Sequence, residues 1–174
     1  RRHEVYDQIV ESGVTAVLRG IDAEDIVPVA EAIHDSDRDV NVLCASGSYY
    51  QEKLAAGYFD GSVSGSLNYA MESMLDHYLA WQEGDIEEAN RIWAGGLADL
   101  HAYIYAENKT RLHPRYKVAT WLRGLIDHPF MRPPMPAPTK EEVERTAELM
   151  ENAGIDVIDR AERDRVMDDP VRTL

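Results

Sequence analysis

The chain has very little cysteine and no long hydrophobic run. Cys44 is its single cysteine, so no disulfide can form within the chain. No stretch approaches the roughly 20 apolar residues that a membrane-spanning helix needs, and no apolar leader opens the sequence. These absences predict a cytoplasmic protein that does not enter a membrane.

Lysine is also scarce, and basic charge is low overall. The sequence holds 18 Lys+Arg, of which four are lysine, against 32 Asp+Glu, which gives a formal net charge of −14. An acidic surface repels phosphate backbones and anionic lipid, so nucleic acid and membrane surfaces are excluded as general partners. Small molecules and proteins remain. The acidic composition is typical of a solvated shell suited to high salt.

Glycine and proline are too few for a disordered chain. The 174 residues are 44% hydrophobic and 29% charged, with 11 Gly and 8 Pro. This composition predicts a folded, soluble chain large enough to bury a core.

Strand and helix patterns alternate along the first half of the sequence. A helical apolar spacing over residues 4–11 is followed by a β-branched run, and an apolar stripe at Ile26, Val29 and Ile33 follows the helix cap Asp22. The predicted strands are residues 14–18, 40–44 and 62–64. Two further helices are predicted, a short one over residues 49–56 and a long one that is opened by residues 65–68 and ends near residue 83. This order predicts parallel strands joined by right-handed crossovers.

The second half reads as helical. We predict one helix from the cap Asp85 to about residue 108, a second from Pro114 to residue 123, and a third after the capping box at residues 139–142, ending at Gly154. The prolines between residues 129 and 138 exclude regular structure there. The last twenty residues are acidic and predict an exposed or frayed tail.

Residues 4–154 resemble the C-terminal half of the dihydrodipicolinate synthase and N-acetylneuraminate lyase family. The segments that carry the resemblance are Val42-Leu43-Cys44-Ala45-Ser46-Gly47, residues 56–68, Trp81-Gln82-Glu83-Gly84-Asp85, His113-Pro114-Arg115-Tyr116-Lys117 and Arg132-Pro133-Pro134-Met135. The family consists of class I aldolases on a (β/α)8 barrel. A complete barrel takes about 250 residues, so the resemblance implies a partial barrel holding the last three β/α units.

A second resemblance concerns the first 35 or so residues. Residues 9–20, with residues 30–33 behind them, are similar to the first strand and helix of 2-keto-3-deoxy-6-phosphogluconate aldolase. The glutamate base that should follow on a second strand is missing. Both resemblances imply the same chemistry, in which a lysine amine forms an imine with a 2-keto acid such as pyruvate.

The lysine that this chemistry requires is not found. Laying the family pattern on the chain puts Arg19 at the Schiff-base position, and a guanidinium cannot form that imine. None of the four lysines lies in a predicted strand, and solvated helical lysines are the rule. They are Lys53, Lys109, Lys117 and Lys140. The catalytic residue therefore stays unknown.

Five residues are candidates for substrate binding. Arg19, at the end of a strand, could hold a keto-acid carboxylate in a bidentate pair, or could simply pair with Asp22 or Glu24. Backbone N–H groups at Ser46 and Gly47 could receive an anion, although a plain polar turn explains them equally. The resemblance implies that Val63, with Ser64 beside it, faces the keto acid.

Histidines and tryptophans give no cofactor signal. His77, His101, His113 and His128 lack the spacing of a metal site, and a lone histidine is more often a surface group. Trp81, Trp93 and Trp121, with the stripe at Leu75 and Leu79, indicate helix core or subunit contacts. We expect no metal and no organic cofactor.

The sequence thus predicts an α/β protein that is divided into three regions. Residues 1–124 form the partial TIM-type barrel of three parallel strands with crossover helices, 125–154 the proline-rich crossing and C-terminal helix of an all-helical region, and 155–174 an acidic tail. The resemblance predicts a lyase-family class I aldolase acting on 2-keto acids such as pyruvate. Because the Schiff-base lysine is not found, an inactive chain of this family is a further expectation. A 2-keto-3-deoxy-(phospho)gluconate aldolase and a non-catalytic binding or assembly module remain alternatives. Open sheet edges predict a homo-oligomer or a partner chain that completes the barrel.

Overall fold

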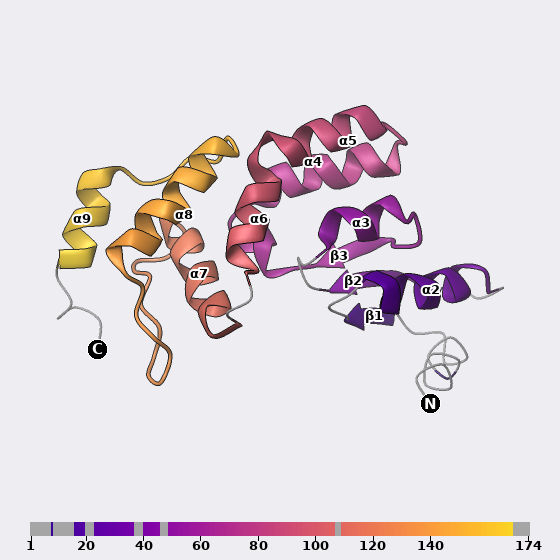
Figure 1. Ribbon diagram of the computed structural model, residues 1–174, viewed down its shortest axis with the longest axis horizontal. Coiled ribbons are helices and arrows are strands. Elements are labelled where there is room, and N and C mark those ends of the chain that lie inside the picture. The colour runs from indigo at the N-terminus through magenta and orange to yellow at the C-terminus, as the bar shows by residue number, and fades with distance from the viewer. Residues whose placement is uncertain are drawn as a thin grey trace. The chain divides into compact units, whose positions relative to one another are not determined.

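The computed structural model describes residues 8, 16–19, 23–36, 40–45, 49–106 and 109–168. Within these residues the strands are β1 (Ala16–Arg19), β2 (Val42–Ala45) and β3 (Gly61–Val63). The helices are α2 (Ala23–His34), α3 (Tyr50–Ala55), η1 (Gly65–Asn68), α4 (Met71–Gln82), α5 (Ile86–Ile92), η2 (Trp93–Leu97), α6 (Ala98–Ile104), α7 (Lys109–Leu122), α8 (Lys140–Asn152) and α9 (Arg160–Asp168), labelled in Figure 1. The helix predicted over residues 4–11 lies almost entirely outside the described residues.

The chain divides into two compact units. Unit 1 comprises Arg1–Gly65 with Tyr78–Ala89, and unit 2 comprises Ser66–His77 with Asn90–Leu174.

Unit 1 contains a three-stranded parallel sheet in the order β1-β2-β3. The expected α/β pattern with parallel strands and intervening helices is therefore confirmed, and the ends of β2 and β3 lie one or two residues from the predicted ones. Alternation along β2 buries Val42 and Cys44 on one face of the sheet. They form a core with Phe59 and the apolar stripe of α2, namely Ile26, Val29, Ala30 and Ile33.

Unit 2 is helical. The single helix predicted over residues 85–108, which begins in unit 1, is interrupted where the chain runs through unit 2. That stretch is α5, a π-helical turn η2 and α6, because Gly96 adopts a φ of +123° and breaks the helix. A Cβ at Gly96 would lie 2.6 Å from the Cα of Ala153, at the end of α8. Glycine is therefore required here both by its backbone conformation and by the closeness of α8.

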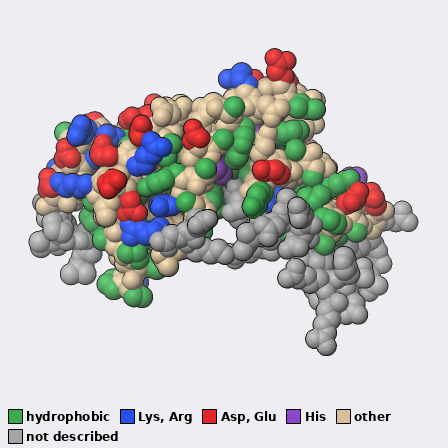
Figure 2. All heavy atoms as spheres, viewed as in Figure 1, with side chains coloured by type: hydrophobic (Ala, Val, Ile, Leu, Met, Phe, Trp, Pro, Cys, Tyr) green, Lys and Arg blue, Asp and Glu red, His purple; other side chains and the backbone are tan. Residues whose placement is uncertain are grey.

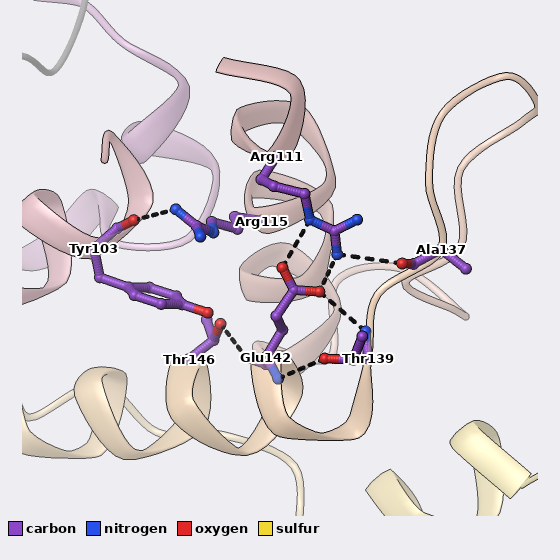
Figure 3. A network of polar contacts seen from close by, with 7 residues as sticks. All are labelled: Tyr103, Arg111, Arg115, Ala137, Thr139, Glu142 and Thr146. Atoms are coloured by element: carbon purple, nitrogen blue, oxygen red, sulfur yellow. Dashed lines mark hydrogen bonds and ion pairs between the residues drawn. The ribbon is translucent and has the colours of Figure 1, made fainter. Parts of the chain in front are cut away.

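The capping box predicted at residues 139–142 is present and is joined to α7. The Thr139 hydroxyl accepts from the Glu142 N–H, and the Glu142 carboxylate accepts from the Thr139 N–H. The same carboxylate pairs with Arg111, which also donates to the Ala137 carbonyl (Figure 3). This pair holds the first turn of α7 on α8, and α7 begins five residues before Pro114 rather than at it.

The tail, predicted to be exposed or frayed, is not frayed over residues 160–168, although most of its described residues are exposed or partly exposed. Residues 160–168 form α9, and Arg163 on this helix is only 8% exposed. Its guanidinium lies 3.2 Å from a Glu144 carboxylate oxygen and 3.6 Å from one of Glu151, both on α8. Ion pairs, rather than apolar burial alone, hold α9 against α8 within unit 2.

Candidate functional site

The carboxyl ends of the three strands meet in one row of backbone positions. The register pairs Arg19 with Ala45 and Ala45 with Val63, each the last residue of its strand. Neighbouring strands lie about 4.8 Å apart, which puts the Arg19 and Val63 backbones on the order of 10 Å from each other. Two of the predicted binding positions thus share an edge of one sheet. Ligands of parallel α/β proteins bind outside this edge.

Val63 is open to solvent at this edge. Its side chain is 51% exposed, and Ser64 follows directly and is partly exposed. Leu43, one position away from the buried Val42 and Cys44, is also partly exposed. The face of the sheet that carries Leu43 is therefore less covered than the face packed on α2.

The small residue Gly61 serves packing. A Cβ at this position would lie 3.0 Å from Cδ2 of Leu43 on β2. The space beside Gly61 is thus taken by a neighbouring side chain rather than left for a substrate. The other predicted binding residues, Ser46 and Gly47, lie outside the described residues, as does the side chain of Arg19.

Lys53 departs from the expectation that the lysines are solvated. Its side chain is fully buried at 0% exposure. It lies on α3 with the buried residues Tyr50 and Leu54, which stand three positions before it and one after it. Helical spacing from Tyr50 was the available signal, since positions i and i+3 share a helix face.

The environment of Lys53 is shared with the single cysteine. Burial raises the pKa of the Cys44 thiol, and this outweighs the lowering by the Ser62 hydroxyl and by the charge of Lys53. Cys44 lies on the face of the sheet that packs against α2, and Lys53 is close enough for its charge to act on this thiol. A desolvated amine suits imine formation, but this one is enclosed rather than open at the strand ends.

The other lysines whose side chains the structure describes are engaged elsewhere. Lys117 donates to the Phe130 carbonyl at 2.5 Å, and Lys140 pairs with Asp168 at the surface. Neither lies in unit 1 with the sheet.

Two of the histidines are buried, contrary to the surface interpretation. His77 is 0% and His101 4% exposed, and both rings pack on Trp93, with centroids 5.4 and 4.9 Å away. Nδ1–H of His101 donates to the Leu97 carbonyl at 2.9 Å, which fixes its tautomer. Burial lowers the pKa of each to about 4, and the neighbouring His101 adds to the effect on His77. Both rings are therefore neutral near pH 7.

In the described part of the chain, no three or more side chains of His, Cys, Asp or Glu come together in a way that could hold a metal ion. Among the same residues no helix combines the length and the apolar character needed to cross a bilayer.

Unit 1 has a parallel sheet with Arg19 and the exposed Val63 at its strand ends, and unit 2 is helical. These features define the class of protein, which is a parallel α/β protein with an additional helical unit. The family model of the dihydrodipicolinate synthetase family matches residues 13–153, which is 141 of the 174 residues. The chain belongs to this family, as the sequence motifs predicted, and is related to lyases. A search of the curated proteins finds no match. The similarity of the first residues to 2-keto-3-deoxy-6-phosphogluconate aldolase stays a prediction.

Proposed function

We propose that this chain binds a 2-keto acid at the carboxyl edge of β1, β2 and β3, with Arg19 holding the carboxylate. The observation that carries the proposal is the register that aligns Arg19, Ala45 and Val63 at one edge. A guanidinium binds a carboxylate through two parallel N–H donors, and it stays charged at all working pH values. The exposed Val63 offers an apolar contact for the carbon chain of the acid.

The proposed architecture is the closing part of a (β/α)8 barrel. Three consecutive strands run parallel in chain order with helices between them, as successive barrel strands do. The less covered sheet face that carries Leu43 corresponds to the barrel interior in this proposal. Further strands, from another copy of the chain or from a partner, would complete it.

Binding of a keto acid does not require the family's Schiff-base chemistry. At the position where the family has its lysine this chain has Arg19, which supplies no nucleophilic amine. Among the lysines whose side chains the structure describes, Lys53 is the buried one. We therefore propose that the chain is a member of the lyase family that binds a keto acid but does not form the family's imine. This proposal keeps the substrate class of the aldolase prediction and the absence of catalysis of the binding-module alternative.

The test combines binding with chemical trapping. Pyruvate is titrated into the full chain by calorimetry, and a second sample is treated with pyruvate and borohydride and weighed by intact mass spectrometry. We expect binding without a covalent adduct, and loss of binding in Arg19→Ala with Arg132→Ala, an exposed arginine of unit 2, as the control. Absence of binding to the unmodified chain would overturn the proposal. An adduct that disappears in Lys53→Arg would instead show that Lys53 forms the imine with pyruvate.

A further inference from the structure

The solvent-facing side of α4 carries an apolar ridge. Met71, Leu75 and Leu79 are 50%, 48% and 44% exposed, and they follow one another at intervals of four residues. All three lie on one continuous helix, so they form a single line along it. We call these three residues the α4 ridge. Figure 2 shows hydrophobic side chains gathered at the surface over α4 and α5.

The ridge is not the buried side of the helix. Met74, His77 and Ala80, at 0%, 0% and 6% exposure, face inward and supply the packing that an amphipathic helix needs. The apolar side chains on the opposite side are therefore in excess of what packing requires. Single exposed leucines are ordinary, but a contiguous apolar line marks an interaction surface.

The charged side chains of α4 and of the turn after it are acidic, and one cation from outside α4, Arg123, lies beside Glu72. Residues 71–85 include the acids Glu72, Asp76, Glu83 and Asp85 and no lysine or arginine. Glu72 and Asp76 stand one residue after Met71 and Leu75, so they border the ridge along one side. Glu72 is 2.8 Å from Arg123 and still 68% exposed at its side chain.

We propose that the α4 ridge docks an amphipathic helix of another protein whose apolar face is bordered by lysine or arginine. Such a segment buries its apolar residues on Met71, Leu75 and Leu79 and places its cations beside Glu72 and Asp76. A second copy of this chain fits less well. In a two-fold antiparallel pairing of α4 with itself, the acidic border of one helix lies against the same border of the other, and like charges repel.

The experiment uses the full chain and a pair of synthetic helical peptides. Both peptides carry leucine at positions i, i+4 and i+8, and they differ only in having lysine or glutamate beside the leucines. We expect the lysine peptide to bind and the glutamate peptide not to bind. The double variant Leu75→Ser, Leu79→Ser should weaken binding of the lysine peptide at least about tenfold, and Asp76→Asn should weaken it several-fold and reduce its salt dependence.

The matched control is Leu125→Ser, since Leu125 is exposed to 61% but lies outside α4. This variant should bind as the unmodified chain does, and circular dichroism checks that every variant is folded. Three results overturn the proposal. They are equal binding of both peptides, binding that Leu75→Ser, Leu79→Ser leaves unchanged, and self-association in sedimentation that the same double variant abolishes, which would make a second copy the occupant.

Discussion

Unit 1 and unit 2 place polar side chains in their interiors in different ways. Of the described side chains that are buried and polar or charged, unit 1 holds Lys53, whereas unit 2 holds Ser66, His77, His101, Thr146 and Arg163. Unit 1 gathers its core from strand alternation and one amphipathic helix. Unit 2 relies on buried hydrogen bonds, aromatic contacts and ion pairs between helices. The free energy of unfolding of unit 2 should therefore depend more strongly on pH and on small changes in the shape of its side chains.

The largest expected effect is acid destabilisation of unit 2. His77 and His101 have pKa values of about 4 in the folded chain and near 6.5 when unfolded. The unfolded state binds more protons between these values, so stability is full above pH 6.5 and falls as pH drops toward 4. We expect a loss of about 2 kcal/mol for each histidine near pH 5. Urea unfolding monitored by tryptophan fluorescence measures it.

The control for this prediction is a variant that removes one of the two buried rings. His77→Gln should reduce the acid-induced loss of stability by about half, because His101 still has its lowered pKa. A free energy of unfolding that stays flat from pH 7 to pH 5 would contradict the contrast between the units.

The next effect concerns the helix break in unit 2. In Gly96→Ala the new Cβ would meet the backbone of Ala153 at 2.6 Å, and the residue would have to keep a φ of +123°. Neither the close approach nor the backbone conformation can relax cheaply, so we expect a loss of about 3 kcal/mol or more. Chemical denaturation gives the value. Gly95→Ala is the matched control, because nothing lies within 4 Å of its Cβ, and its effect should stay below about 1 kcal/mol.

Much of the fold is readable from local patterns because those patterns have local causes. Period-two apolar runs and glycine turns predicted three strands, and their order along the chain predicted that they run parallel. The capping box needs only Thr139 and Glu142, which are three residues apart. The helix break at Gly96 could not be predicted in this way, since it depends on the closeness of Ala153, a residue far along the chain.

The candidate site was predictable only in part, because it also depends on residues that are far apart in the sequence. Parallel strands bring their carboxyl ends together, which links Arg19 and Val63 before any coordinates are known. Their alignment in one row depends on a one-residue register, which the sequence does not specify. The burial of Lys53 and Arg163 runs against the preference of charged residues for solvent, and it arises from neighbours on other elements.

A moderate effect is expected where α7 meets α8 in unit 2. Burial raises the pKa of Glu142, but the Arg111 hydrogen bond, the Thr139 N–H and the arginine charges bring it below its usual 4.5. Glu142→Gln removes the charge and keeps a side chain that can complete the capping box. We expect a loss of about 1 to 2 kcal/mol from this variant and about 1 kcal/mol more from Glu142→Ala. Thermal unfolding compares them, and equal losses in the two variants would show that the cap contributes nothing.

The smallest effect is expected in unit 1, for a hydrogen bond at the surface rather than a buried contact like those of unit 2. The Tyr58 hydroxyl donates to a Glu31 carboxylate oxygen at 2.9 Å, and this hydrogen bond, with the negative charge of Glu31, raises the phenol pKa above 10. In Glu31→Gln the acceptor loses its charge, so the Tyr58 pKa should fall back toward 10. Ring resonances of labelled tyrosine, followed by NMR against pH, measure the shift. Because the folded pKa is the raised one, this contact stabilises unit 1 below pH 10 and is lost as pH rises further. An unchanged titration of Tyr58 would show that this hydrogen bond does not join α2 to the α3–β3 connection.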